Sequence, residues 1–279
     1  MEFVNRIGMT LVGEAYGKPA NPPVLLSHGG GQTRHAWGGT AAALGERGWR
    51  AIAYDHRGHG ESDRAPAREY QFQAFAEDVV DLARTFDRPP AFVGASLGGL
   101  SGLLAQGDFS PGCLSVLVLV DVTPRMEPDG ATRILEFMLD KVEEGFASLD
   151  EVADAVAAYQ PHRQRPRNLE GLRKNLRHDP DGRWRWHWDP AIFTGPDPLA
   201  MRRRAERFAS AAGALDIPTL LVRGRMSDLV SEEAAAEFLE LVPHADYVDV
   251  SNAGHMVAGD RNDVFTEAVV EFLERQYAT

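Results

Sequence analysis

A serine set between two glycines is the feature of this sequence that most directly suggests chemistry. The stretch "FVGASLGGLSGLLA" (92–105) holds Ser96, with Gly94 two residues before it and Gly98 two residues after it. The residues before Ser96 are apolar and strand-like, and those after it are small and compatible with a helix. Such a turn can expose a hydroxyl for attack, but G-x-S-x-G also occurs by chance. Partners for the serine must therefore be found elsewhere in the chain.

Candidate partners stand at the ends of other strand-like runs. Asp228 follows the run "TLLVRG", His255 follows "DYVDVS", and three glycines (29–31) close "VLLSHGGG". In an open α/β sheet the reacting groups gather at the carboxyl ends of the strands. A hydroxyl, a carboxylate and an imidazole are therefore expected at one edge of the sheet, in the chain order Ser, Asp, His. The glycines let the backbone approach a ligand closely there.

With these residues in view, the sequence resembles the α/β-hydrolase superfamily. The resemblance rests on "HGGG" (28–31), "DHRGHGES" (55–62), "GASLGG" (94–99), the aspartate of "GRMSDLVS" (224–231) and the histidine of "AGHM" (253–256). It implies an α/β fold with a mostly parallel, doubly wound sheet, and it identifies the turn at Ser96 as a nucleophile elbow. It covers 1–123 and 211–279 as the core and leaves 124–210 as an inserted helical cap.

The resemblance and the needs of the reaction assign a role to each residue. Ser96 is expected to attack a carbonyl while His255 takes its proton, because a serine hydroxyl is a weak nucleophile at neutral pH. Asp228 is expected to orient His255 and to stabilise the imidazolium. The backbone N–H groups of Leu97 and Gly30 are expected to form the oxyanion hole. The predicted reaction is hydrolysis of a carboxylic ester or lactone through an acyl-enzyme.

The identity of the acid has an alternative in the sequence. Asp121 closes the apolar run "SVLVLVDV" (115–122), and relatives of this fold sometimes supply the acid from that strand. Asp228 is the prediction and Asp121 is its competitor. Asp55 also ends a strand, but within "DHRGHGES" it is expected to be structural, as are His56 and His59.

The elements that must position these residues follow from the pattern of apolar runs. Strands are predicted at 24–29, 50–55, 91–96, 115–122, 219–224 and 246–251, and amphipathic helices at 72–86, 231–242 and 263–276. Strands that alternate with helices indicate an open sheet covered on both faces. Residues 2–17 are typical of an antiparallel hairpin at the sheet edge.

The alternation stops between 124 and 210, where the sequence predicts helices at 131–146 and 150–159 and an extended segment in "GRWRWHWDP" (182–190). Tryptophans at every second position suit a strand. These rings either bind an apolar part of the substrate or pack the cap onto the core, and the sequence leaves both open. The residues predicted to bind substrate are Gly31, Trp37, Trp186 and His187.

Composition limits the class of protein and its partners. The chain has 279 residues, of which 44% are hydrophobic and 25% charged, with a net charge of −12. This acidic balance argues against a nucleic-acid partner, which needs a basic surface. Residues 160–207 nevertheless carry 12 Lys and Arg against 6 Asp and Glu. This segment either attracts an acidic substrate or is a solvated helical face.

Cysteine content and the terminal sequence set further expectations. Cys113 is the single cysteine, so no disulfide framework and no cysteine metal site is expected. Neither a metal nor another cofactor is predicted. The N-terminus has no secretory pattern and no run reaches the length of a membrane span, so we expect a cytoplasmic protein without membrane contact. The oligomeric state stays open, with a homodimer among the possibilities.

Five alternative functions share this fold with ester hydrolysis. Epoxide hydrolases and haloalkane dehalogenases have aspartate as the nucleophile, so Ser96 argues against both. Cofactor-free haloperoxidases share the serine triad but commonly lack a large cap. Hydrolases of carbon–carbon bonds in ring-cleavage products have both the triad and a cap. A receptor that binds its ligand without turnover is the non-enzymatic alternative.

Overall fold

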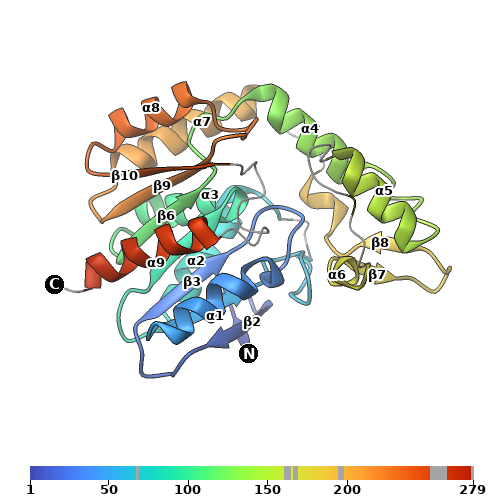
Figure 1. Cartoon of the computed structure of the whole chain (residues 1–279), viewed down its shortest axis with the longest axis horizontal. Helices are drawn as coiled ribbons and strands as arrows, with labels where there is room; N and C mark the ends of the chain where they lie inside the picture. Colours follow the sequence, from blue (N-terminus) through green and yellow to red (C-terminus); the bar gives the residue numbers. More distant parts are fainter. Residues whose placement is uncertain (67–68, 160–164, 166–168, 194–197, 252–262, 278–279) are drawn as a thin grey trace.

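A mostly parallel sheet runs through the part of the chain that the computed structural model describes, residues 1–66, 69–159, 165, 169–193, 198–251 and 263–277 (Figure 1). Its strands are β1 (Glu2–Val4), β2 (Thr10–Tyr16), β3 (Pro23–Ser27), β4 (Arg50–Tyr54), β5 (Ala91–Ala95), β6 (Val116–Val120), β9 (Thr219–Gly224) and β10 (Asp246–Val250). Their spatial order is β1-β2-β4-β3-β5-β6-β9-β10. β2 pairs antiparallel with both β1 and β4, and the other neighbours are parallel. The predicted strands and the edge hairpin are confirmed.

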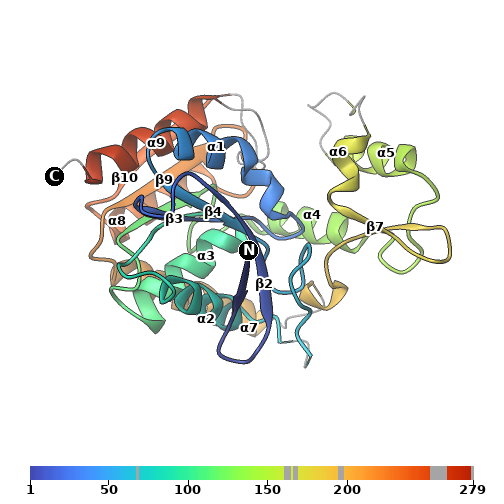
Figure 2. The ribbon, with the colours of Figure 1, turned by 90° about the horizontal axis from the view of Figure 1, so that it is seen from below.

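Helices cover both faces of this sheet. They are α1 (Gly38–Glu46), α2 (Phe72–Ala83), α3 (Leu97–Leu104), α7 (Pro198–Gly213), α8 (Glu232–Leu241) and α9 (Asp263–Tyr277). Side chains of α1 and α9 share one buried cluster with the sheet, and those of α2, α3, α7 and α8 share another. Figure 2 shows α1 and α9 together on one side of the strands. The doubly wound α/β fold predicted from the sequence is therefore present.

Local sequence explains why these elements form. Every residue of β3, β5 and β6 is buried, because each of these strands lies inside a sheet covered on both faces. α8 begins after Ser231, whose hydroxyl oxygen accepts a hydrogen bond from the backbone N–H of Ala234 (3.1 Å). This contact satisfies one of the free donors of the first turn. The sequence pattern predicted this helix start at Ser231.

A smaller group of elements lies beside the sheet in Figures 1 and 2. It consists of α4 (Pro128–Leu139), α5 (Leu149–Tyr159), α6 (Glu170–Arg173), β7 (Leu176–His178) and β8 (Trp184–Trp186). β7 and β8 form an antiparallel hairpin, so the inserted segment is not purely helical. α4 ends seven residues earlier than the predicted helix, because the backbone of Asp140 is extended and Lys141 has a φ of 51°. Trp186 and Trp188 lie in the apolar cluster that holds this group together.

The boundary of the inserted segment lies inside a helix. α7 crosses residue 210, where the sequence analysis ended the insertion, and its Phe208 is already buried in the cluster beneath the sheet. We therefore propose that the second part of the core begins before Phe208. In the described residues, none of the helices has the length and apolar character that crossing a bilayer requires.

Candidate active site

Ser96 occupies the sharp turn between β5 and α3. Its backbone angles are φ 47° and ψ −114°, a conformation that residues with a side chain rarely adopt. The turn is held because the N–H of Ser96 donates to the carbonyl of Val120 (3.2 Å) and its carbonyl accepts from the N–H of Leu100 (3.0 Å). Strain of this kind, kept in place by the surrounding fold, presents the serine at the carboxyl edge of the sheet.

The glycines around Ser96 are required by close packing. A Cβ atom on Gly94 would lie 2.6 Å from the backbone of Gly98, and one on Gly98 would lie 2.4 Å from the carbonyl oxygen of Ser27. A Cβ on Gly99 would lie 2.6 Å from the side chain of Val122. These contacts leave no room for a side chain, so α3 can press against β3 and β5 only with glycine at these positions. The motif "GASLGG" therefore has a structural cause in this fold.

The glycine loop after β3 lies next to Ser96. A Cβ on Gly29 would be 3.4 Å from the Cβ of Ser96. The N–H of Gly29 donates to Oε1 of Gln32 (2.9 Å), and the N–H of Gly31 donates to Nε2 of His59 (3.0 Å). Among the described residues, the N–H of Gly30 has no acceptor. The N–H of Leu97, at the first position of α3, has none there either. Both predicted oxyanion donors are thus N–H groups that the described contacts leave without an acceptor.

Asp121 and Ser96 follow neighbouring strands of the sheet. It follows β6 directly, is fully buried, and has a φ of 49°. One carboxylate oxygen accepts from the N–H of Gly224 (3.0 Å) and the other accepts from the hydroxyl of Ser227 (2.6 Å). The hydroxyl oxygen of Ser227 in turn accepts from the N–H groups of Leu229 and Val230, both at 3.1 Å. The carboxylate of Asp121 is therefore held rigidly at the edge of the sheet.

Asp228 is placed differently from Asp121. Its side chain is 31% exposed and forms an ion pair with Arg133 of α4. A Cβ on Gly130 would lie 2.1 Å from the carbonyl oxygen of Asp228, so α4 packs directly onto this backbone. Burial, followed by the charge of Asp228, raises the pKa of Tyr159 to about 12. These contacts connect Asp228 to the inserted segment, and they provide the carboxylate with a partner other than a histidine.

His255 and Trp37 are two predicted residues that the structure does not place at this edge of the sheet. His255, the predicted base, lies outside the described residues. Trp37 is fully buried in the apolar cluster of α1 and α9, with its ring centroid 6.0 Å from that of Phe265. This position beneath the sheet favours a packing role for Trp37 over the predicted contact with substrate, because the surrounding side chains leave it no exposed surface.

Residues of the inserted segment that were not predicted to bind substrate also lie beside the glycine loop. A Cβ on Gly30 would contact the ring of Phe193 at 3.4 Å. A Cβ on Gly31 would lie 2.5 Å from the sulfur of Met138 and 3.1 Å from the ring of Trp188. Met138, Trp188 and Phe193 thus cover the loop, although the sequence offered only the aromatic content of this segment as a signal.

Trp186 packs behind Trp188, and His187 contacts the backbone of the core loops, including that of Gly31. The ring of Trp186 stacks on that of Trp188 with centroids 4.8 Å apart, and it also packs against Phe146 at 5.3 Å. Nδ1 of His187 accepts a hydrogen bond from the N–H of Gly60 (2.6 Å). Trp186 therefore belongs to the interior of the inserted segment, and His187 attaches that segment to the core.

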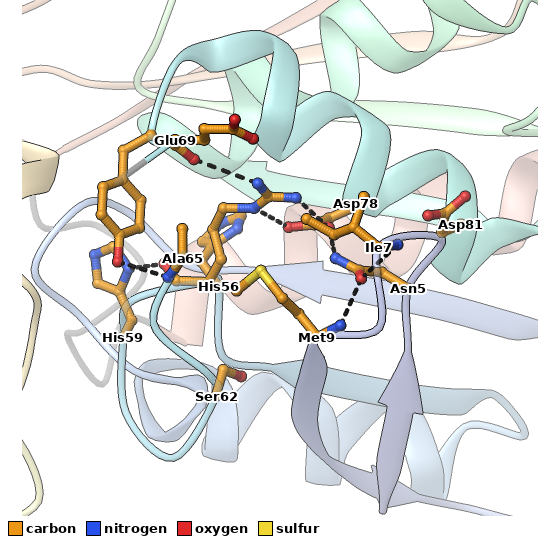
Figure 3. Close-up of polar contacts among 12 residues, drawn as sticks. Asn5, Ile7, Met9, His56, His59, Ser62, Ala65, Glu69, Asp78 and Asp81 are labelled. Atoms are coloured by element: carbon orange, nitrogen blue, oxygen red, sulfur yellow. Dashed lines mark hydrogen bonds and ion pairs between the residues drawn. The ribbon is translucent and has the colours of Figure 1, made fainter. Parts of the chain in front are cut away.

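A buried polar network supports the loop that follows β4 (Figure 3). The guanidinium of Arg57 donates to both carboxylate oxygens of Asp78 (2.6 and 2.7 Å), and the amide of Asn5 donates to the same carboxylate (2.7 Å). Figure 3 also shows Met9 beside Asn5, where its N–H donates to the Asn5 side chain (2.9 Å). Each guanidinium nitrogen of Arg57 and each carboxylate oxygen of Asp78 takes part in a hydrogen bond, and these contacts fix the loop that carries His56 and His59.

Four buried histidines join this loop to the glycine loop and the inserted segment. Burial lowers the pKa of His28, His59 and His187 to about 3 and that of His56 well below its usual value. Neutral rings suit the contacts, because His59 and His187 each use one nitrogen as an acceptor for a backbone N–H. In the described residues, no group of three or more His, Cys, Asp or Glu has the placement of a metal site.

Comparison with known proteins places this geometry in a family. The family model described as the alpha/beta hydrolase fold matches residues 22–261. Esterase Rv0045c of Mycobacterium tuberculosis is 32% identical over 259 residues, 91% of this chain and 83% of that protein. The 3-hydroxybutyrate-oligomer hydrolase of Cupriavidus necator is 32% identical over 253 residues, 86% of this chain and 85% of that protein.

A solved structure agrees over nearly the whole chain. The crystal structure of E-2-(acetamidomethylene)succinate hydrolase superimposes with a TM-score of 0.82 at 25% identity, covering 98% of each chain. The sheet order, the strained serine turn and the matched sequence all lead to one conclusion: the chain belongs to the α/β-hydrolase fold family.

Proposed function

We propose that this chain is a serine hydrolase that cleaves a carboxylic ester or lactone through an acyl-enzyme on Ser96. The observation that carries the proposal is the strained turn at Ser96 beside two backbone N–H groups, of Gly30 and Leu97, that have no acceptor in the described part of the chain. An oxyanion needs donors that are already in place when it forms. The hydrolase relatives, one of them an esterase, support the same reaction class.

The reaction requires a base, and His255 is proposed for it. As Ser96 attacks the carbonyl carbon, its proton passes to His255 and the carbonyl oxygen becomes an oxyanion between Gly30 and Leu97. The intermediate collapses when the bond to the leaving oxygen breaks, and His255 returns the proton to that oxygen. Water then attacks the acyl-enzyme with His255 again as base, which releases the acid and restores Ser96.

We propose Asp121, the alternative in the sequence analysis, as the acid of this triad in place of Asp228. A triad acid must be held so that it fixes the tautomer of the histidine and stabilises the imidazolium. The buried carboxylate of Asp121, oriented by Gly224 and Ser227, meets this need better than the partly exposed carboxylate of Asp228, which is paired with Arg133.

The substrate proposed for this site has an apolar part. Met138, Trp188 and Phe193 lie over the glycine loop and present a thioether and two aromatic rings to it. Apolar walls with a few placed polar groups are typical of small-molecule sites. An ester or lactone with a hydrophobic acyl or leaving group is therefore the substrate class that we propose.

The test of this function uses the nucleophile and a matched serine. Ser96→Ala is expected to fold normally and to lose at least about 10³-fold in kcat on p-nitrophenyl esters. Ser101→Ala, which removes a buried hydroxyl of the same helix that donates to the Leu97 carbonyl, is expected to keep its activity. A sulfonyl fluoride should add its sulfonyl group to the wild type and not to Ser96→Ala, measured by intact mass.

The substrate panel also separates the alternatives. It contains p-nitrophenyl esters, lactones and a vinylogous diketone. Turnover of esters or lactones that depends on Ser96 supports the proposal. Cleavage of the diketone alone would assign carbon–carbon hydrolysis instead, and binding of every compound without turnover would assign a receptor.

A further inference from the structure

A cavity lies at the seam between the core and the inserted segment. Its volume is about 430 Å³. Core residues from 33–35 and 60–64 form one side, and residues from 174–177 with His187 form the other. Ser96, Gly30 and Leu97 are not among the residues that line it. The cavity is therefore separate from the candidate catalytic site, although the N–H of Gly60 and the ring of His187 connect its two walls.

The lining of this seam cavity holds more cationic than anionic side chains. Arg34, Arg64, Lys174 and Arg177 face one carboxylate, that of Glu61. Arg34 is paired with Asp55 and Glu61, and Arg177 is paired with Asp179 (3.0 Å). Arg64 and Lys174 form no ion pair or hydrogen bond with the part of the chain that the structure describes. The cavity therefore has a local excess of positive charge, although the whole chain has a net charge of −12.

His187 joins the two walls of the cavity. The residue is only 9% exposed, and Nδ1 accepts a hydrogen bond from the Gly60 N–H, so the proton of the neutral ring is on Nε2. Nε2 is enclosed by protein, and a backbone hydrogen bond with Gly31 partly opposes the lowering of the ring's pKa by burial. His187 therefore fixes the shape of the cavity, and the basic side chains are the donors that a ligand in it can reach.

The cations of the cavity help to lower the pKa values of two histidines that line it. Burial is the main reason why the pKa of His35 is lowered, but Arg34 and Lys174 both contribute to the lowering. Arg64 contributes in the same direction at His187, again after burial. An anion in the cavity would oppose these charges, and it would raise the pKa of His35.

We propose that the seam cavity binds a small oxyanion, with phosphate or carboxylate oxygens, between Arg64 of the core and Lys174 of the inserted segment. The anion accepts charge-assisted hydrogen bonds from these side chains, which are the strong class of hydrogen bond. Because the two cations come from opposite sides of the seam, a bound anion holds the inserted segment against the core. The site is additional to the catalytic residues and does not depend on their assignment.

The experiment measures binding of inorganic phosphate and of succinate to the full chain by calorimetry, with sodium chloride at matched ionic strength as the reference. We expect one saturable site for at least one of the two anions, and a melting temperature that rises with its concentration. Arg64→Ala and Lys174→Ala should each weaken binding at least about tenfold. Lys18→Ala, an exposed lysine between β2 and β3, is the matched control and should bind like the wild type.

Two further measurements test whether the anion binds in this cavity. Lys174→Arg should restore binding, because it returns the charge and the donors at the same position. Protein whose Ser96 has been sulfonylated should still bind the anion. The proposal is wrong if neither anion binds above the chloride reference, if Lys18→Ala weakens binding as much as Lys174→Ala, or if sulfonylation abolishes binding. The last result would place the anion in the catalytic pocket.

Discussion

At the residue scale, the two aspartates show how the same side chain acquires different roles. Asp121 is fully buried and accepts hydrogen bonds from a backbone N–H and a serine hydroxyl, so its carboxylate keeps one orientation. Asp228 is partly exposed and paired with an arginine of the inserted segment. An exposed ion pair contributes at most about 1 kcal/mol to stability, and its geometry is easily changed. A carboxylate that orients an imidazole must keep one position, as the carboxylate of Asp121 does.

A comparison of two amide variants tests this assignment. Asp121→Asn is expected to lower kcat by about 10⁴-fold, because the histidine is then held in the wrong tautomer. Asp228→Asn is expected to keep most of kcat and to change the free energy of unfolding by less than about 1 kcal/mol. Both values come from steady-state kinetics and urea unfolding of the same preparations. The reverse pattern would return the role of the acid to Asp228.

At the scale of elements, the aromatic residues of β8 and of the turn that follows it have two different roles. Some pack inside the inserted segment, and others lie over the glycine loop of the candidate active site. Trp186 lies in the cluster with Phe146 and Trp188, whereas the ring of Phe193 lies over Gly30 of the glycine loop. A residue inside a packed cluster affects the stability of the whole segment. A residue over the loop contacts some substrates more than others, so it affects selectivity.

This division predicts different phenotypes for two alanine variants. Phe193→Ala should change the ratio of kcat/KM between p-nitrophenyl octanoate and acetate, because only the long acyl chain reaches the ring. Trp186→Ala should leave that ratio nearly unchanged and lower the stability by about 3–5 kcal/mol, as expected for a buried aromatic side chain. Kinetics with both esters and a thermal melt decide between the roles. A changed ratio in Trp186→Ala, as the sequence analysis implies, would bring that ring into the pocket.

At the scale of the whole molecule, buried neutral histidines make the fold sensitive to acid. His28, His59 and His187 have folded-state pKa values of about 3, because burial disfavours the charged ring. In the unfolded chain a histidine titrates near about 6.5. The unfolded state therefore binds more protons between these two values, and the stability that is present above pH 6.5 is lost as the pH falls toward 3.

The resulting prediction concerns the slope of stability against pH. Urea unfolding between pH 7.5 and 5 should show a free energy of unfolding that falls by up to about 1.4 kcal/mol per pH unit for each such histidine. His187→Asn keeps an acceptor for the Gly60 N–H and should reduce this slope by one histidine's share. His244→Gln, at an exposed position, should leave the slope unchanged. Equal slopes in the wild type and His187→Asn would mean that His187 is not buried in its neutral form.

The sequence by itself determined the sheet and the order of the candidate residues along it. Strands buried on both faces must be continuous apolar runs, and the close approach of α3 to β3 and β5 admits only glycine at 94, 98 and 99. Because these requirements are local, short stretches of sequence are enough to predict them. The turn at Ser96 and the glycine loop could be located in the same way.

Only the tertiary structure decided what surrounds each candidate. The donors to Asp121 come from residues 103 and 106 positions further along the chain, and no local pattern connects them. In the same way, the sequence could not place Trp37 beneath the sheet, Phe193 over Gly30, or His187 beside Gly60. Burial and hydrogen-bond partners depend on segments that meet only when the sheet is assembled, and these are the quantities that distinguish a residue of the site from one of the core.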